Sequence, residues 1–260
     1  QINTDLIEKK ITEKTLAIMP THLLGRPSNM ASIIKLAAKY NLHIIEDACE
    51  ALGSRYKNKL CGTIGDMGCF SFFVSHSITT GEGGAIATNN PVLAELARSL
   101  RNHGRKSSKP GEHFIFPHIG FSAKMNSMEA IIGLGVIDNL PKYISQRNKN
   151  MLKINDFLDN EALGNLKHEY IVPHGYPILV NSKKQRDRLL VDIPNKLGIE
   201  TRQIFYSIPT QSEAYKFLGE KIGSYPIAED IGRRGLYFPC HQNLSNEELK
   251  RIARALRNII

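Results

Sequence analysis

The sequence predicts an α/β protein whose first half contains a largely parallel sheet and whose second half is a smaller α+β region. Three observations support this prediction. Short apolar runs alternate with segments of helical periodicity in the first hundred residues, which is the order of strand–helix–strand units. Polar side chains follow the apolar runs where the strands should end. Beyond Pro141 the strand and helix segments are shorter and less regular. We therefore expect two domains, residues 1–140 and 141–260.

The first expected elements form a strand–helix–strand unit. The apolar run 15–20 ends at a proline and is typical of a short buried strand. Ser28 or Asn29 can cap a helix over 30–41, where apolar residues recur at helical spacing. The run 42–48 is then a second buried strand with acidic residues at its carboxyl end. Such a parallel sheet should be covered on both faces.

The chain continues with a hairpin and two further strands. The hairpin is expected at 55–62, and the strands at 68–73 and 84–89, on either side of a polar loop. Pro91 opens the next helix, and Gly104 is the expected C-cap.

The later elements follow from the same signals. Residues 105–120 lack periodicity and should form a surface loop, and a helical stretch over 126–158 is broken at Pro141. Ser245 and Glu248 form a capping box for the last helix. The remaining expected elements are strands at 176–180, 199–205 and 236–239 and helices near 184–197 and 225–234.

Composition limits the possible functions. A hydrophobic content of 42% and a charged content of 23% are ordinary for a globular protein. The chain has no apolar run of about 18 residues, and its first residues lack the apolar stretch of a signal peptide. We expect no membrane contact and a cytoplasmic location. The four cysteines are dispersed, which favours reduced thiols and no metal site.

The charge of the chain is basic, with a formal net charge of +9. The one dense basic segment, 101–109, has no interleaved aromatic residues for base stacking, so nucleic acid is not an expected partner. That segment is either a solvated loop or a phosphate-binding loop.

The candidate site residues lie where strands end. Asp47 follows one buried strand, and His76 lies in the loop that follows another. Ligands bind at the carboxyl ends of the strands in open α/β sheets. Asp47 is either a loop-tethering carboxylate or the counter-ion of a cofactor nitrogen. His76 is either a structural histidine or an acid–base group. The hydroxyls near it, Ser71 included, belong to a turn or to a phosphate cradle.

Several stretches together point to one family. The segments 44–56, 65–73 and 79–90, which read IIEDACEALGSRY, GDMGCFSFF and TTGEGGAIATNN, resemble the DegT/DnrJ/EryC1/StrS sugar aminotransferases. The resemblance continues through further matching segments at 96–105, 119–134, 198–205, 225–232 and 239–245.

This resemblance implies the fold and partners. Family members are fold-type I enzymes dependent on pyridoxal 5'-phosphate (PLP), with a large α/β domain and a small α+β domain. They act on nucleotide-linked keto sugars, use glutamate as amino donor, and usually form homodimers. The resemblance also implies that the large domain is N-terminally truncated here. The absent segment would help to bind the cofactor phosphate.

One position departs from the family pattern. The aminotransferases carry the Schiff-base lysine where this chain has His76, and an imidazole cannot form an imine. This makes the loop similar to the family's sugar 3-dehydratases, which use pyridoxamine 5'-phosphate (PMP). The acidic Glu50 agrees with that group. The dispersed cysteines fit the dehydratases that lack an iron–sulfur cluster. The expected reaction is 3-dehydration of a nucleotide-linked 4-keto-6-deoxy sugar, with His76 moving the proton.

The resemblance also implies roles for other residues. Asp47 would pair with the pyridine nitrogen, Ser71 would hold the phosphate, and Glu50 would lie near the cofactor ring oxygen or the substrate. The remaining expected residues are Ser122 and Lys124 near the cofactor phosphate, and Arg101, His103 and Arg105 at the nucleotide diphosphate. Two alternatives stay open, a sugar-nucleotide aminotransferase and a catalytically silent homologue that binds sugar nucleotide or a partner subunit.

Overall fold

The computed structural model describes residues 1–106, 109–112, 114–159, 164–206 and 208–259. The described chain divides into two compact units. The first is Gln1–Ser145 with Asn165–Val172, and the second is Gln146–Gly164 with Pro173–Ile260. Within these ranges no helix has the length and apolar character needed to cross a membrane.

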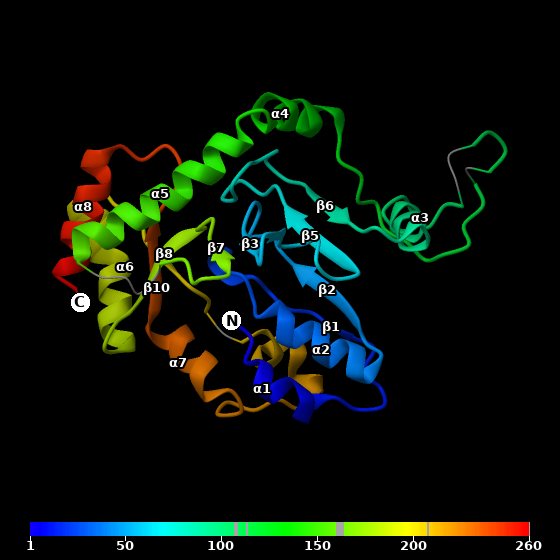
Figure 1. Ribbon diagram of the computed structural model, residues 1–260, viewed down its shortest axis with the longest axis horizontal. Coiled ribbons are helices and arrows are strands. Elements are labelled where there is room, and N and C mark those ends of the chain that lie inside the picture. The colour runs from blue at the N-terminus through cyan, green and yellow to red at the C-terminus, as the bar shows by residue number, and fades with distance from the viewer. Residues whose placement is uncertain (107–108, 113, 160–163, 207, 260) are drawn as a thin grey trace. The chain divides into compact units, whose positions relative to one another are not determined.

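The first unit contains the parallel sheet. Its elements are α1 Thr4–Ile7, β1 Ala17–Ile18, α2 Met30–Tyr40, β2 His43–Asp47, β3 Arg55–Tyr56, β4 Lys59–Leu60, β5 Met67–Ser71, β6 Gly84–Ala87, α3 Pro91–Leu100, α4 Ser127–Ile137 and β7 Glu169–Tyr170 (Figure 1). The main sheet has the order β1-β2-β5-β6. β1, β2 and β5 are parallel, and β6 runs antiparallel to β5. A smaller sheet has the order β4-β3-β7. The predicted α/β fold with a largely parallel sheet is confirmed.

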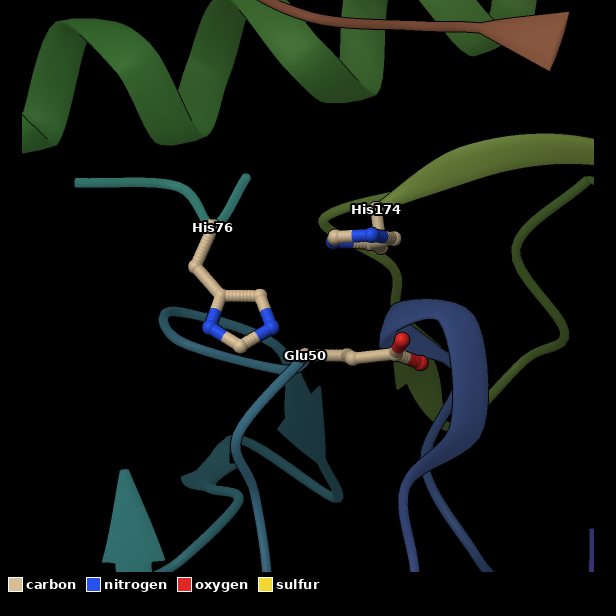
Figure 2. Close-up of side chains that lie close together, drawn as sticks. All are labelled: Glu50, His76 and His174. Atoms are coloured by element: carbon tan, nitrogen blue, oxygen red, sulfur yellow. The ribbon is translucent and has the colours of Figure 1, made fainter. Parts of the chain in front are cut away.

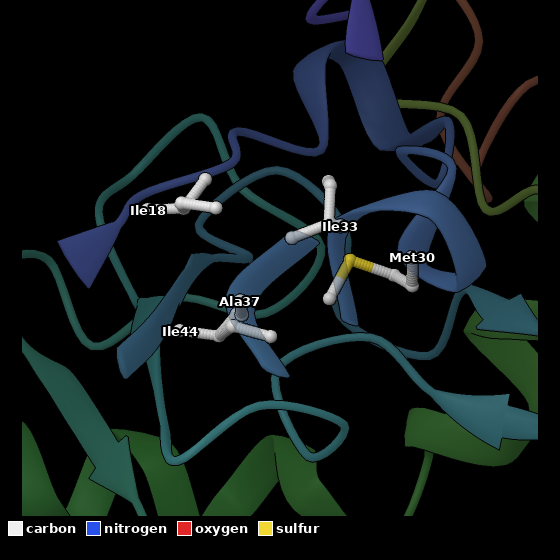
Figure 3. Packing of buried hydrophobic residues seen from close by; sticks show 5 residues of the cluster. All are labelled: Ile18, Met30, Ile33, Ala37 and Ile44. Carbon is white, nitrogen blue, oxygen red and sulfur yellow. The ribbon is translucent and has the colours of Figure 1, made fainter. Parts of the chain in front are cut away.

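The core of this unit lies between α2 and the first two strands. Met30, Ile33 and Ala37 recur at helical spacing and face Ile18 of β1 and Ile44 of β2 (Figure 3). All five side chains are buried, and each of the larger ones contributes about 1.5–3 kcal/mol through burial. This packing fixes the position of β2, the strand that ends at Asp47.

Both ends of α2 are capped by asparagines. Asn29 Oδ1 accepts the N–H of Ser32 at 3.3 Å, so of the two expected caps, Ser28 and Asn29, it is Asn29 that caps the helix. At the other end Asn41 adopts the left-handed conformation with φ 51° and ends the helix.

Two expectations for the β6 and α3 region are wrong. The sheet is not covered on both faces at β6, because its first three residues are exposed. α3 ends at Leu100 with Arg101 as C-cap, so Gly104 is not the cap. Gly104 has φ 77°, and a Cβ there would lie 1.8 Å from the carbonyl oxygen of His118. The glycine thus permits the close approach of a chain segment fourteen residues away, which helix signals cannot reveal.

The second unit is an α+β assembly around an antiparallel sheet. α5 Leu140–Leu158 enters it from the first unit, with Pro141 in its first turn. Its further elements are β8 Gly175–Leu179, α6 Lys183–Leu197, β9 Arg202–Gln203, α7 Pro226–Arg234, β10 Gly235–Pro239 and α8 Asn246–Arg257. The sheet order is β8-β10-β9. The capping box of Ser245 and Glu248 at the start of α8 is confirmed.

Candidate functional site

The site begins at the carboxyl ends of two neighbouring parallel strands. Asp47 ends β2 and Ser71 ends β5. In the sheet register Asp47 lies opposite Cys69, so the two strands finish at the same edge. The structure therefore brings these two sequence-predicted residues to one edge of the first unit's sheet.

Asp47 is half-buried and held from two sides. Its Oδ1 accepts the backbone N–H of Cys49 at 3.2 Å, and its Oδ2 accepts the Thr21 hydroxyl at 3.4 Å. The main chain of the same residue bonds to the neighbouring segment, because His22 N–H donates to its carbonyl at 2.9 Å. An ionised carboxylate offers about four lone-pair sites. Asp47 can thus accept a further donor without losing its two supports.

Glu50 lies three residues beyond Asp47 and is oriented by the backbone. The N–H of Leu24 donates to its Oε2 at 2.6 Å. Leu24 has the left-handed φ of 55°, which is unusual for a leucine and aims this N–H at the carboxylate. Burial raises the pKa of Glu50, the negative charge of Asp47 raises it further, and the Leu24 bond opposes both.

His76 lies on the loop between β5 and β6. The loop is closed by backbone bonds from Phe72 N–H to the Gly83 carbonyl and from Thr80 N–H to the Phe72 carbonyl, both 2.9 Å. The N–H of His76 donates to the Phe73 carbonyl at 3.0 Å, and the two rings meet edge to face with centroids 6.1 Å apart. This frame holds the half-buried imidazole beyond the end of β5.

The imidazole of His76 and the carboxylate of Glu50 come close together within the first unit. A ring nitrogen of His76 and a carboxylate oxygen of Glu50 lie within 4.8 Å of each other. Figure 2 shows both side chains, with Glu50 extending toward the blue N-terminal segment that holds Leu24. His174, the third labelled side chain, belongs to the second unit.

Sequence reasoning did not identify Glu46, a buried residue of β2 that supports this edge of the sheet. The carboxylate of Glu46 is fully buried and accepts four N–H groups, those of His22 Nε2 at 2.9 Å, Gly62 at 2.8 Å, Ile64 at 2.6 Å and Gly65 at 2.7 Å. Burial by itself would raise the pKa of Glu46, but the four hydrogen bonds outweigh it and lower that pKa. A signal was available, because strand alternation puts Glu46 on the buried face with Ile44.

Two expected basic residues, one at the nucleotide diphosphate and one near the cofactor phosphate, line a different part of the first unit from Asp47 and His76. Arg101 and Lys124 line a cavity of about 910 Å³ beside β6 and α3. Glu82 and Glu129 also line it, so its charge is mixed. Among the described residues its lining does not include Asp47, Ser71 or His76.

Ser122, His103 and Arg105 lie around the loop that follows α3. Ser122 forms an isolated antiparallel bridge with Asn102. His103 has φ 62° and its N–H donates to the Phe121 carbonyl at 2.8 Å. The guanidinium of Arg105 lies 5.9 Å from the ring centroids of both Phe114 and Phe116. Positions 107 and 108 of the basic segment lie outside the described residues.

Solved structures similar to this chain define its class. A putative sugar aminotransferase from Streptococcus pneumoniae, solved in a PMP form, aligns with a TM-score of 0.88 at 25% identity, covering 99% of this chain and 70% of that one. The same protein in a PLP form aligns with a TM-score of 0.87. The fold is thus that of a PLP-dependent enzyme of the sugar aminotransferase type.

Sequence comparisons identify the family. This chain matches the profile of the DegT/DnrJ/EryC1/StrS aminotransferase family over residues 1–257, and it belongs to that family. It is 38% identical over 252 residues to a GDP-perosamine synthase of Escherichia coli O157:H7, covering 96% of this chain and 67% of the relative. It is 30% identical over 277 residues to a GDP-4-keto-6-deoxy-D-mannose 3-dehydratase of Yersinia pseudotuberculosis, covering 98% and 70%. The chain thus spans about two thirds of the length of these relatives.

The residues at the carboxyl edge fit a PMP group by their donor chemistry. Asp47 can accept the N–H of a protonated ring nitrogen. The Ser71 hydroxyl accepts the Phe73 N–H at 3.2 Å, which leaves its own proton to donate to a phosphate oxygen. Residues 69–90 contain no lysine, so this loop offers an imidazole and no amine for a covalent link.

Proposed function

We propose that this chain acts on a nucleotide-linked 4-keto-6-deoxy sugar as a PMP-dependent 3-dehydratase, with His76 in place of a Schiff-base lysine. The observation that carries the proposal is the position of His76 in the loop after β5, beyond the strand end that neighbours Asp47. An imidazole at this place can take up and return a proton near neutral pH, but it cannot form an imine.

Three residues would hold the cofactor. Asp47 would accept the ring N–H, and its bonds to Thr21 and Cys49 support this because they fix the carboxylate. Ser71 would donate to the phosphate. Glu50 would lie near the cofactor ring oxygen or the substrate. When bound, PMP supplies an amine that condenses with the sugar ketone and a ring that accepts electrons.

His76 would carry the proton transfer. Its ring nitrogen would take a proton from the carbon beside the cofactor amine and then give it to the departing 3-hydroxyl. The loop supports this role because its closing bonds fix the position of the imidazole beyond β5. A positioned acid–base group of this kind contributes roughly a hundred- to ten-thousand-fold in rate.

The proposal also includes the other expected residues. Ser122 and Lys124 would act at the cofactor phosphate, and Arg101, His103 and Arg105 at the nucleotide diphosphate. We also propose a homodimer, glutamate as amino donor, a cytoplasmic location and no iron–sulfur cluster.

A second candidate is a sugar-nucleotide aminotransferase. The relative with 38% identity is a GDP-perosamine synthase, and this favours amino transfer. In that case the replacement of lysine by His76 would reroute or impair proton transfer.

One assay separates the candidates. The chain is incubated with PMP, glutamate and GDP-4-keto-6-deoxy-D-mannose, the sugar named for the Yersinia relative. Mass spectrometry showing loss of the 3-hydroxyl supports the dehydratase, and an amino sugar supports the aminotransferase. His76→Gln is the matched control and should abolish dehydration. Absence of any turnover would contradict both enzymatic proposals.

A covalent trap gives an independent check. The chain is mixed with PLP, reduced with borohydride and mapped by peptide mass spectrometry. The proposal expects no adduct in the peptide that contains residues 69–90, which has no lysine. A stoichiometric adduct at one lysine elsewhere would overturn the role of His76.

A further inference from the structure

We propose that Glu50 is a positioning residue for His76, whose carboxylate orients the imidazole and stabilises the imidazolium formed when His76 takes up a proton. The use of this pair in catalysis rests on the proposed function, but the pairing does not. It gives Glu50 a role different from the contact with cofactor or substrate that the family resemblance implies.

The geometry of the first unit supports the pairing. A ring nitrogen of His76 and a carboxylate oxygen of Glu50 lie within 4.8 Å (Figure 2). Opposite charges at such a separation favour each other's ionised form. Acid–base contacts also shorten when a site is loaded, so a small rotation of either side chain can complete a hydrogen bond.

The carboxylate is held so that it can act as an orienting group. Leu24 N–H fixes its Oε2 with a bond of 2.6 Å, and Leu24 is itself buried in an unusual left-handed conformation. The same turn begins at His22, whose ring is clamped by Glu46. A base whose partner is fixed by a third group is the arrangement found in activated nucleophile and general-base sites.

The charges around the carboxylate also favour a cationic neighbour. Burial and Asp47 raise the pKa of Glu50, so an imidazolium beside it would relieve an unfavourable charge. Burial raises the pKa of the Cys49 thiol to about 12 and also raises that of Cys69, so both thiols stay neutral. The negative charge of Asp47 is therefore one of the causes of the raised pKa of Glu50.

The proton balance of the pair is simple. When His76 takes a proton at its ring nitrogen, the imidazole becomes a cation next to the Glu50 carboxylate. When it returns the proton to a leaving hydroxyl, water is released and the imidazole is neutral again. Glu50 gains and loses no proton in this cycle, so its effect is electrostatic and orientational.

The test is an NMR titration of the 260-residue chain without cofactor. The histidine Cε1–H signals are followed with pH, and the signal of His76 is assigned by its loss in His76→Gln. In Glu50→Gln the pH midpoint of the His76 titration should lie below that of the native chain by on the order of one pH unit. Glu13→Gln, which removes one exposed carboxylate from the same unit, should leave the midpoint unchanged.

A conservative variant separates positioning from structure. Glu50→Asp keeps the charge on a shorter side chain, so the midpoint should recover most of the way to that of the native chain. If Glu50→Gln does not fold, Glu50→Asp should still lower the midpoint slightly. A midpoint equal to that of the native chain in every folded Glu50 variant would overturn the pairing.

The NMR result on the Glu50–His76 pair can be told apart from the result of the dehydration assay. A lowered midpoint in Glu50→Gln together with a failed dehydration assay would retain the pair and overturn the dehydratase. If the His76 titration midpoint is equal in Glu50→Gln and in the native chain while dehydration is active, the dehydratase is retained and the pair is overturned.

Discussion

His22 donates its Nε2–H to the buried carboxylate of Glu46 across 2.9 Å, and its Nδ1 accepts the Ser28 N–H, also at 2.9 Å. The Ser28 bond fixes the tautomer, because a ring nitrogen that accepts cannot also carry the proton. Both side chains are completely buried. This pair joins the turn at residues 21–25 to β2, and that turn supplies the partners of Asp47 and Glu50.

The first prediction concerns this pair and stability. Glu46→Gln replaces an oxygen that accepts N–H groups with an amide NH2, so at least one buried donor loses its acceptor. We expect a loss of about 2–4 kcal/mol in the free energy of unfolding. Urea unfolding followed by circular dichroism measures it. Glu13→Gln, on an exposed residue, should change the free energy by less than about 0.5 kcal/mol. Equal stability of the two variants would contradict the role of Glu46.

The second prediction is a pH dependence of opposite sign for the two carboxylates. The pKa of Glu46 is lowered in the fold, so its contribution to stability is present above the ordinary carboxyl pKa and is lost as pH falls through the lowered value. The pKa of Glu50 is raised, so the folded state holds its proton longer than the unfolded state does. Glu50 therefore reduces stability as pH rises from the ordinary carboxyl pKa through the raised value.

Urea unfolding at about pH 4 and about pH 8 tests the Glu50 half of this prediction. Glu50→Gln should gain stability relative to the native chain at the higher pH, while the two should be nearly equal at the lower pH. Glu46→Gln, the matched control, should instead lose stability at the higher pH. A Glu50→Gln variant that is less stable than the native chain at the higher pH would show that the carboxylate is favourably paired there.

The third prediction restores the amine that the loop lacks. His76→Lys should form an imine with PLP, because the side chain then ends in a primary amine at the same position on the loop. The measurement is a visible absorption band that borohydride removes, followed by an adduct within residues 69–90. The native chain mixed with PLP is the control and should give no adduct in that peptide. A colourless His76→Lys variant would contradict the placement of His76 beside the cofactor.

The fourth prediction concerns the proposed contact between Asp47 and the ring nitrogen of PMP. Asp47→Asn keeps an oxygen that can accept the Cys49 N–H but removes the charge, so PMP should bind about ten-fold more weakly or worse. Isothermal titration with PMP measures the affinity. Asp5→Asn, on an exposed residue of the first unit, should bind PMP as the native chain does. Unchanged affinity in Asp47→Asn would remove Asp47 from the proposed site.

Much of the fold could be read from local signals. Ser245 was identified as a cap, and the cap of α2 was narrowed to Ser28 or Asn29, because the capping bond forms within three residues of the cap. β2 and α2 were placed because their side-chain periods reflect which face is buried. The same signals failed at Gly104, where the glycine serves a contact with residues 118–120 and not the end of a helix.

Only some of the residues at the carboxyl edge of the sheet could be predicted from the sequence. The rule that ligands bind at the carboxyl ends of strands selected Asp47 and the loop with His76. It did not reveal that Glu50 is held by Leu24, because these residues are 26 positions apart and the bond depends on a left-handed backbone at a leucine.

The family, the α/β order of strands and helices, and an imidazole in place of the expected amine could all be predicted from the residues alone. These are properties of residue identity and of short-range periodicity. Only the tertiary structure decided that Glu46 and His22 form a buried pair, that Leu24 orients Glu50, and that Glu50 lies within 4.8 Å of His76. The physical reason is that burial and hydrogen-bond satisfaction depend on which distant segments the fold packs together. The imidazole of His76 is thus known from residue identity, whereas the carboxylate beside it is known only from the packing of the fold.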